Sequence, residues 1–217
     1  MNVGPLYLVT DRSLTRGRPL EEVVARAVQG GVTVVQLREK EAPTRSFVEL
    51  ARQLKALLAL SGVPLLINDR VDLALAVGAD GVHIGQEDLP YPLARQLLGP
   101  RALIGLSVET EAQVLAAEDC DLAYLGVSPI FPTPTKTDTR GSWGLDGLAR
   151  VRRLSRHPLV AIGGLNAANA GAAVTAGADS IAVVSAICLA EDPREAATTL
   201  SAIIRQALAA RRKERPV

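Results

Sequence analysis

The stretch AVGADGVHIG, residues 76–85, decides the fold because it joins the end of a helical pattern to a short β-type run. The same joint recurs as AVQGGVTVVQL at 27–37 and as TAGADSIAVVS at 175–185. In each copy a helix end, a glycine, a small residue and an acid or threonine lead into a strand. A recurrent joint is expected where every helix-to-strand turn solves the same geometric problem.

Over the whole chain, eight β-type runs alternate with amphipathic Ala/Leu/Arg stretches. The predicted strands are Leu6–Val9, Thr33–Leu37, Leu65–Ile67, Gly81–Ile84, Leu103–Leu106, Ala123–Val127, Leu159–Ile162 and Ser180–Val184. The predicted helices are 20–29, 45–60, 70–77, 91–98, 110–118, 146–155, 167–176 and 193–212. Eight such units predict an α/β fold, a single (β/α)₈ TIM barrel.

An open doubly wound sheet is the competing fold. It usually carries a glycine-rich phosphate-binding turn after its first strand, whereas this chain has Thr10-Asp11-Arg12 there. The chain has 217 residues, of which 48% are hydrophobic and 22% charged, enough for one large core but short for two. We therefore expect one catalytic domain over residues 1–217.

Charge and composition narrow the partners. A net charge of +1 and 3% aromatic residues argue against a nucleic-acid surface, so we expect small-molecule substrates. No basic leader and no run of 18 apolar residues occurs, so we expect a soluble, cytoplasmic protein with no membrane partner. The sequence leaves open whether the chain forms a homo-oligomer. Cys120 and Cys188 are expected to be buried reduced thiols, and His83 and His157 are too few for a zinc site.

The segment YLGVSPIFPTPTKTD, residues 124–138, carries hydroxyl groups and a lysine under three prolines that restrict φ. The prolines exclude a helix, so the side chains are expected to project from a stiff loop at the carboxyl end of a strand, where barrels place their chemistry. Such a set suits an anion. A surface linker rich in Pro and Thr is the alternative.

Polar residues also follow the second to fifth predicted strands. Because side chains alternate along a strand, Gln36, Arg38 and Lys40 are expected to point together into the barrel mouth, while ion pairs of Arg38 and Lys40 with Glu39 and Glu41 are the alternative. The other polar residues expected at this rim are Asn68, Asp69, Asp88 and Ser107.

Asp69 and Asp88 come from neighbouring strand ends and offer hard oxygen ligands for one Mg²⁺ that keeps several waters. Helix capping is the alternative for both residues. A second anion site is expected where Gly163-Gly164 follows the seventh strand and Val184-Ser185 follows the eighth, because exposed backbone N–H groups converge there.

Several motifs together resemble the thiamine phosphate synthase family over nearly the whole chain. They are LYLVTDR (6–12), VQLREK (35–40), INDRVDLALAVGADGVHIGQEDLP (67–90), IGLSVET (104–110), GVSPIFPTPTKTD (126–138), AIGGL (161–165) and GADSIAVVSAI (177–187). The resemblance implies a Mg²⁺-dependent transferase that joins 4-amino-2-methyl-5-hydroxymethylpyrimidine diphosphate to 4-methyl-5-(2-phosphoethyl)thiazole. Thiamine phosphate and pyrophosphate would be the products.

The resemblance also implies roles for particular residues. The pyrimidine diphosphate would contact Gln36, Leu37, Arg38, Glu39, Lys40, Asn68, Ser107 and Lys136, and Mg²⁺ would bind Asp69 and Asp88. The thiazole phosphate would contact Thr133, Pro134, Thr135, Gly164, Val184 and Ser185. Glu109 departs from the family pattern, in which a histidine is common at this position.

The expected chemistry is dissociative. Arg38, Lys40, Lys136 and Ser107 are the expected catalytic residues, the cations stabilising the leaving diphosphate while the family's pyrimidine carbocation is captured by the thiazole nitrogen. A thiazole tautomerase of the same superfamily and a non-catalytic binder of thiamine phosphates are the alternatives. Residues 137–145 are expected to form a mobile lid, or else Trp143 anchors the loop on the barrel.

Overall fold

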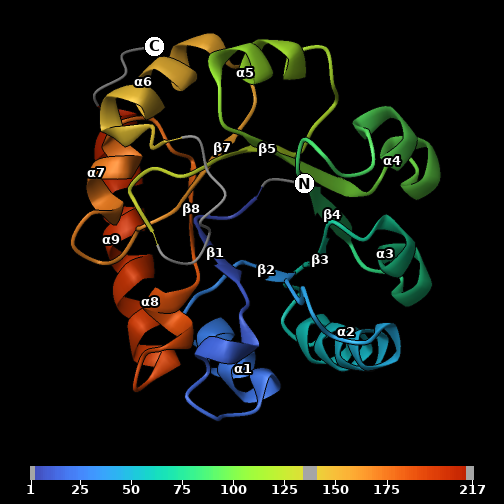
Figure 1. The fold of residues 1–217 in the computed structure, drawn as a ribbon. Helices are drawn as coiled ribbons and strands as arrows, with labels where there is room; N and C mark the ends of the chain where they lie inside the picture. The colour runs from blue at the N-terminus through green and yellow to red at the C-terminus, as the bar shows by residue number, and fades with distance from the viewer. Residues whose placement is uncertain (1–2, 134–140, 214–217) are drawn as a thin grey trace.

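A computed structural model of the chain describes residues 3–133 and 141–213. Its eight parallel strands form one closed barrel in sequence order, with β1 paired to β8, and the helices surround it (Figure 1). The strands are β1 Leu6–Val9, β2 Val34–Leu37, β3 Leu65–Asn68, β4 Gly81–Ile84, β5 Leu103–Val108, β6 Tyr124–Val127, β7 Leu159–Ile162 and β8 Ser180–Val183. The predicted barrel is confirmed, and the open doubly wound sheet is excluded.

The outer helices match the predicted stretches closely. They are α1 Leu20–Gln29, α2 Thr44–Ala59, α3 Val71–Val77, α4 Tyr91–Leu98, α5 Glu111–Ala117, α6 Gly144–Leu154, α7 Ala170–Thr175 and α9 Pro193–Lys213. Two short elements were not predicted, the 3₁₀ helix η1 Arg12–Leu14 and the helix α8 Ser185–Cys188. Both follow strand ends directly, η1 after β1 and α8 after β8.

The alternation of side chains along the strands builds two apolar layers. Leu6 and Leu8 of β1 belong to the layer between the barrel and the helices, while Tyr7 and Val9 of the same strand belong to the layer inside the barrel. Because the inner layer fills the barrel below its mouth, polar side chains at the strand ends are left as the floor and walls of a cavity.

In each copy of the recurrent joint, a side-chain oxygen accepts a hydrogen bond from the backbone N–H at the start of the preceding strand. The N–H at the start of β1 donates to Thr33 Oγ1 (3.2 Å), that of β3 donates to Asp80 Oδ2 (2.9 Å), and that of β7 donates to Asp179 Oδ2 (2.9 Å). Each acceptor residue precedes the next strand of the barrel. The threonine or acid of the joint therefore ties the start of one strand to its neighbour, which is the geometric problem that the repeat solves.

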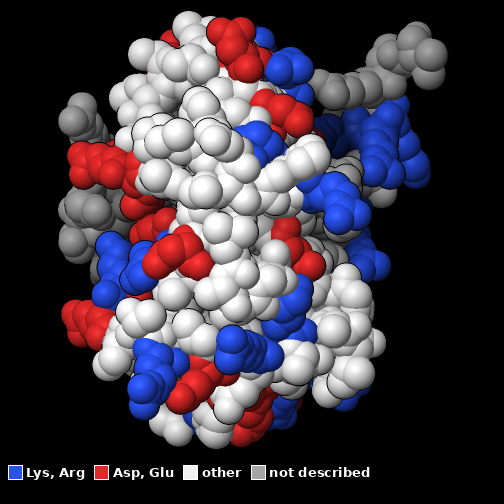
Figure 2. Space-filling view, turned by 90° about the vertical axis from the view of Figure 1, so that its right-hand side faces the viewer, with Lys and Arg blue, Asp and Glu red and all other residues white. Residues whose placement is uncertain are grey.

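The surface shows basic and acidic side chains interspersed over the side that carries α3 and α4 (Figure 2). Among the described helices, none is long and apolar enough to cross a membrane. Cys188 is buried, as expected, but Cys120 is only partly buried, so the prediction of two buried thiols was wrong for Cys120. Both cysteines are free thiols.

Candidate functional site

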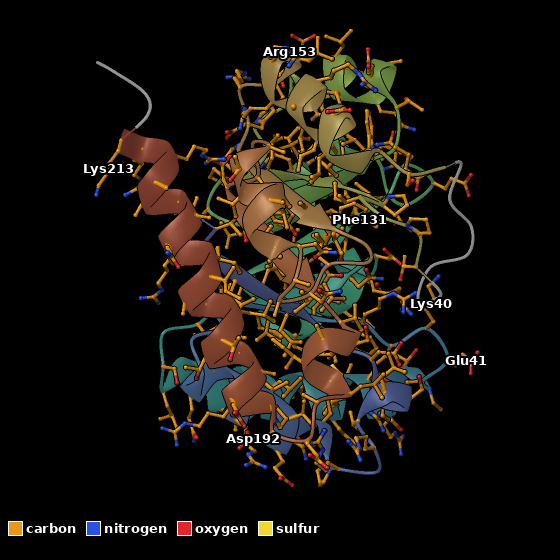
Figure 3. All side chains as sticks on the ribbon, turned by 90° about the vertical axis from the view of Figure 1, so that its left-hand side faces the viewer. Lys40, Glu41, Phe131, Arg153, Asp192 and Lys213 are labelled. Carbon is orange, nitrogen blue, oxygen red and sulfur yellow. The ribbon has the colours of Figure 1, made fainter. Side chains whose placement is uncertain are left out.

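A cavity of about 840 Å³ opens at the carboxyl ends of the strands, and all eight strands or the loops that follow them contribute to its walls. In Figure 3, Lys40 and Phe131 lie toward the right of the molecule, whereas α9, which follows Asp192 and ends at Lys213, lies on the left. The volume lies within the range of small-molecule sites. The predicted rim is therefore a real concave site.

Asp69 and Asp88 come together at the mouth of this cavity. Burial, a hydrogen bond to Asp88 and the charge of Asp88 raise the pKa of Asp69 to about 6, and the charge of Lys40 opposes the rise. Asp88 Oδ2 also accepts a hydrogen bond from Gly85 N (2.6 Å). Two carboxylates that compete for one proton are a favourable place for a divalent cation, which would replace that proton.

Neither carboxylate caps a helix. The residue before α3 is Arg70 and the residue before α4 is Pro90, and no side-chain capping bond is formed at either start. Asp69 has φ +62°, a left-handed conformation, and its N–H donates to His83 O (2.8 Å). This conformation turns the chain at the end of β3. Among the described residues, no group of three or more His, Cys, Asp or Glu side chains is placed to hold a metal ion.

The cations after β2 do not pair with the glutamates beside them. Arg38 lies 3.9 Å from Asp11, and Glu39 pairs with Arg12 at 3.3 Å. Gln36, Arg38 and Lys40 all line the cavity, as the alternation predicts. The side chain of Leu37 instead packs between the barrel and the helices.

The turns after β7 and β8 form the opposite wall. Gly163 has φ +102° and Gly164 has φ +65°, and a Cβ on Gly164 would lie 2.8 Å from the Phe131 Cβ atom. Glycine is therefore required for this close approach. Val184 precedes α8, which begins at Ser185, and Gly164, Val184 and Ser185 all line the cavity.

A chain of hydrogen bonds that the sequence did not predict crosses the cavity floor. Gln36 Nε2 donates to Tyr7 Oη, Tyr7 Oη bonds Tyr124 Oη, Tyr124 Oη bonds His83 Nδ1, and His83 Nε2 bonds Ser107 Oγ, each at 2.8 Å. The residues come from β1, β2, β4, β5 and β6. We call these five side chains the polar relay. The register of β4 could have revealed His83, since Val82 and Ile84 on either side face outward.

Two glycines make room for the relay. A Cβ on Gly105 would lie 2.1 Å from the Tyr124 ring, and one on Gly126 would lie 2.9 Å from the His83 ring. The rings of His83 and Tyr124 stack with centroids 5.5 Å apart, and Tyr7 meets Tyr124 edge to face at 5.7 Å.

The other rim residues divide into those that line the cavity and those outside the described residues, and Glu109, the departure from the family pattern, belongs to the first group. Asn68, Thr133 and Glu109 line the cavity, and Glu109 N donates to Gln113 Oε1 at 2.7 Å. Pro134, Thr135 and Lys136 lie outside the described residues, as does residue range 137–140 of the expected lid.

Trp143 and His157 both lie away from the cavity. Trp143 packs against the outer apolar layer, and its backbone N–H donates to Pro129 O (2.9 Å) just before α6, which favours the anchoring role over a mobile one. His157 is buried before β7, at the amino-terminal face as expected, where its ring Nε2 lies 3.0 Å from Ala117 O.

Comparison with known proteins gives a consistent picture. A family model described as thiamine monophosphate synthase matches residues 6–187. A thiamine-phosphate synthase of Albidiferax ferrireducens is 58% identical over 92% of this chain and 91% of its own length, and one of Vibrio parahaemolyticus is 50% identical over 94% and 100%. The solved structure of a thiamine phosphate pyrophosphorylase from Pyrococcus furiosus has a TM-score of 0.87 at 41% identity and covers 95% of this chain and 98% of that one. An orotidine 5'-phosphate decarboxylase from Pyrococcus horikoshii, at 18% identity and a TM-score of 0.68, shares the fold alone.

Proposed function

Because the chain belongs to the thiamine monophosphate synthase family, we propose that it joins 4-amino-2-methyl-5-hydroxymethylpyrimidine diphosphate to 4-methyl-5-(2-phosphoethyl)thiazole. The products are thiamine phosphate and pyrophosphate. The observation that carries the proposal is one cavity with two walls, each suited to an anion. Asp69, Asp88 and Lys40 lie on one wall and Gly164 and Ser185 on the other.

The first wall suits the diphosphate. Arg38 and Lys40 supply positive charge; Arg38 lies 3.9 Å from Asp11, and Glu39 between the two cations pairs with Arg12. When the bond between the pyrimidine methylene carbon and the diphosphate oxygen breaks, its electron pair leaves with the oxygen. Cations fixed beside that oxygen stabilise the charge as it develops. Lys136, outside the described residues, is proposed to join them.

Mg²⁺ is the proposed cofactor, and Asp69 and Asp88 would hold it. The raised pKa of Asp69 supports this assignment, because after burial its main causes are the hydrogen bond and the charge of Asp88, which lies close to it. Held by these two carboxylates, Mg²⁺ would supply positive charge that stabilises the diphosphate as it leaves.

The second wall suits the thiazole phosphate. Gly163, Gly164 and Ser185, where α8 begins, all line the cavity, and the turns after the seventh and eighth strands are a common place for a phosphate in barrels. Held there, the thiazole would present its nitrogen lone pair to the methylene carbon, and the new C–N bond would replace the broken C–O bond. Holding both rings in one cavity removes the entropy of their encounter, worth about 7–11 kcal/mol in well-oriented systems.

The test is product formation from both substrates with Mg²⁺, followed by chromatography for thiamine phosphate and an assay for pyrophosphate. We expect the two products in equal amounts, and neither when one substrate is left out. Isomerisation of a thiazole phosphate without pyrophosphate release would instead support the tautomerase. Tight binding of thiamine phosphate without turnover would support the non-catalytic binder.

A further inference from the structure

The turn before α1 holds the carboxyl end of α8, the helix that supplies part of the second wall. We propose that Arg18, in this turn, is a positioning residue that sets the affinity of the second wall for the thiazole phosphate. Arg18 is not among the described residues that line the cavity. Its effect on the substrate rests on the proposed function, whereas its hold on α8 stands independently of that function.

The guanidinium of Arg18 makes four hydrogen bonds, all to backbone carbonyl oxygens. Nη2 donates to Cys188 O (3.0 Å) and Ala190 O (2.8 Å), and Nη1 donates to Glu191 O (2.9 Å). Nε donates to Thr15 O (3.0 Å), in the turn that carries Arg18 itself. Because a guanidinium presents its donors in one fixed plane, this side chain fixes the carboxyl end of α8 relative to the turn.

α8 is too short to keep its place by itself. It comprises four residues, Ser185–Cys188, and a helix of about one turn is not stable alone. The carbonyl groups at the end of any helix have no partner inside it, so they need donors from elsewhere. Ile187 and Cys188 are fully buried and anchor the inner face of α8 in the core. Arg18 supplies the missing donors at its carboxyl end.

The outer side of α8 is open. A hollow of about 420 Å³ lies there, lined by Ala186, Ala190 and Glu191 and by residues of α9. Ala186 also lines the main cavity, so α8 separates this hollow from the substrate site. The small alanine side chains leave space on the outer side, and the hydrogen bonds of Arg18 oppose a shift of α8 into it.

The turn has an unusual backbone that places Arg18 at this point. Arg18 N donates to Thr15 O (3.2 Å), and the residues between them, Arg16 and Gly17, have φ +57° and φ +78°. Positive φ at both central positions is the pattern of a type I′ turn. Within the described part of the chain, Arg16 and Asp69 are the non-glycine residues with positive φ. Such conformations are uncommon and concentrate at functional sites. The turn leads into α1, which lies beside α8 (Figure 1).

The end of α8 that Arg18 holds is joined directly to the second wall. Val184 and Ser185 line the cavity at the start of α8. Cys188 N donates to Val184 O (2.9 Å) and Leu189 N donates to Ser185 O (3.0 Å), so the two ends of α8 move together. Loss of Arg18 therefore displaces the second wall and leaves the residues after β2, β3 and β4 in place. It should weaken binding of the thiazole phosphate and spare the pyrimidine diphosphate.

Thiol labelling tests the hold on α8 without any substrate. Cys188 is buried in α8, so a thiol reagent reaches it only when α8 opens. In Arg18→Ala, Cys188 should be labelled at least about 10-fold faster than in the unmodified protein. Cys120, which lies outside α8, should be labelled at the same rate in both and is the internal reference. An unchanged labelling rate of Cys188 in folded Arg18→Ala would overturn the proposal.

Arg211→Ala is the matched control. Arg211 also donates to backbone carbonyl groups, those of Val174 (2.9 Å) and Ala178 (2.7 Å), but it does so at the joint before β8, on the opposite end of the barrel. This variant should lose stability without faster labelling of Cys188. Equal acceleration in the two variants would mean that Cys188 reports general loosening, and the specific hold of Arg18 on α8 would be wrong.

Kinetics and calorimetry test the effect on the substrate. In Arg18→Ala, the KM and Kd for the thiazole phosphate should rise by about 10-fold or more, while kcat and the KM for the pyrimidine diphosphate change by less than about twofold. Arg211→Ala should leave these values unchanged. Arg18→Lys keeps the positive charge but not the planar guanidinium, so it should show the same selective rise. Equal losses for both substrates, or a normal thiazole-phosphate KM in Arg18→Lys, would overturn the proposal.

The role of Arg18 and the proposed function fail separately. If Cys188 labelling and the Kd for the thiazole phosphate change as expected but no thiamine phosphate forms, the proposed function fails and the role of Arg18 stands. If thiamine phosphate forms with the same KM values in Arg18→Ala as in the unmodified protein, the role of Arg18 is wrong and the proposed function stands.

Discussion

Asp69 combines an unusual backbone conformation with an unfavourable electrostatic environment. Asp69 has a left-handed φ of +62°, which turns the chain where β3 ends. Burial and the neighbouring Asp88 raise the pKa of Asp69 to about 6. A non-glycine residue in this conformation is uncommon and needs support from its surroundings. Strain and carboxylate repulsion at one position indicate a site shaped for a ligand rather than for stability.

The raised pKa predicts a pH dependence of stability in metal-free protein. Because folded Asp69 binds its proton more tightly than the unfolded chain does, its contribution favours folding below the unfolded pKa and is lost as the pH rises through about 6. Asp69→Asn should therefore gain in melting temperature relative to the unmodified protein between pH 4.5 and pH 8, by on the order of a few degrees. Thermal unfolding in EDTA measures this.

Mg²⁺ provides the control for this effect. Added Mg²⁺ should raise the melting temperature of the unmodified protein at pH 8 and leave Asp69→Asn nearly unchanged, because binding to the folded state alone stabilises it. A constant difference between the two proteins across the pH range would contradict the close contact of Asp69 and Asp88.

The two thiols should differ sharply in reactivity. Burial raises the pKa of the Cys188 thiol to about 11, and Cys188 is buried while Cys120 is partly exposed. Thiolate is the reactive form, so a thiol reagent at pH 8 should label Cys120 first. Mass spectrometry of the labelled, folded protein should show modification at Cys120 alone. Rapid labelling of Cys188 would mean that the packing around α8 opens readily.

At the residue scale, strand-end position predicted which polar side chains meet. Gln36, Arg38, Lys40, Asp69 and Asp88 all line the cavity, because parallel strands end at one rim. The polar relay was not predicted from the sequence. Tyr7 and Tyr124 occupy positions typical of ordinary core residues, and His83 was considered only as a zinc ligand, not as a hydrogen-bonding side chain. Only a three-dimensional structure brings their hydroxyl groups within 2.8 Å.

At the scale of the elements, strands were easier to predict than short helices. β-Branched runs with a joint before them gave the predicted strands, whose bounds differ from the observed ones by at most two residues. α8 has four residues and therefore no apolar periodicity to detect. α7 begins at Ala170, not at 167, because Asn166 N donates to Asn169 Oδ1 (2.8 Å) and Ala168 N donates to Asn166 Oδ1 (2.9 Å), which forms a turn instead.

The joint before β8 predicts a specific loss of stability. Asp179 accepts from Leu159 N and pairs with Arg152 (2.9 Å) and Arg211 (2.7 Å), which ties β7, α6 and α9 together. Asp179→Ala leaves these donors without their acceptor and should lower the free energy of unfolding by about 2 kcal/mol or more. Urea unfolding measures the change.

An exposed ion pair gives the comparison. Asp72 pairs with Arg70 at 2.6 Å, but its side chain is 63% exposed, so Asp72→Ala should change stability by less than about 1 kcal/mol. Equal losses in the two variants would mean that the joint acts only as a surface ion pair and not as a tie between strands.

At the scale of the whole molecule, closure of the barrel brings together residues far apart in sequence. Asp69 and Asp88 follow β3 and β4, while Gly164 and Ser185 follow β7 and β8, and all four face one cavity of about 840 Å³. The closed ring was predictable from eight repeated units. Two anion sites at its mouth were also expected from the sequence, one from the polar residues after the second to fifth strands and one from the glycines after the seventh. The structure adds that both groups of residues line one cavity.

The measurement that tests this arrangement most directly is steady-state kinetics of Asp88→Asn and Gly164→Val, with each substrate varied in turn and Mg²⁺ titrated. Asp88→Asn should lower kcat by about 10²-fold or more and raise the Mg²⁺ requirement, with little change in KM for the thiazole phosphate. Gly164→Val should raise KM for the thiazole phosphate selectively, because a side chain there obstructs the phosphate. If both variants instead impaired the same substrate to the same extent, the account of two separate anion-binding walls would be wrong.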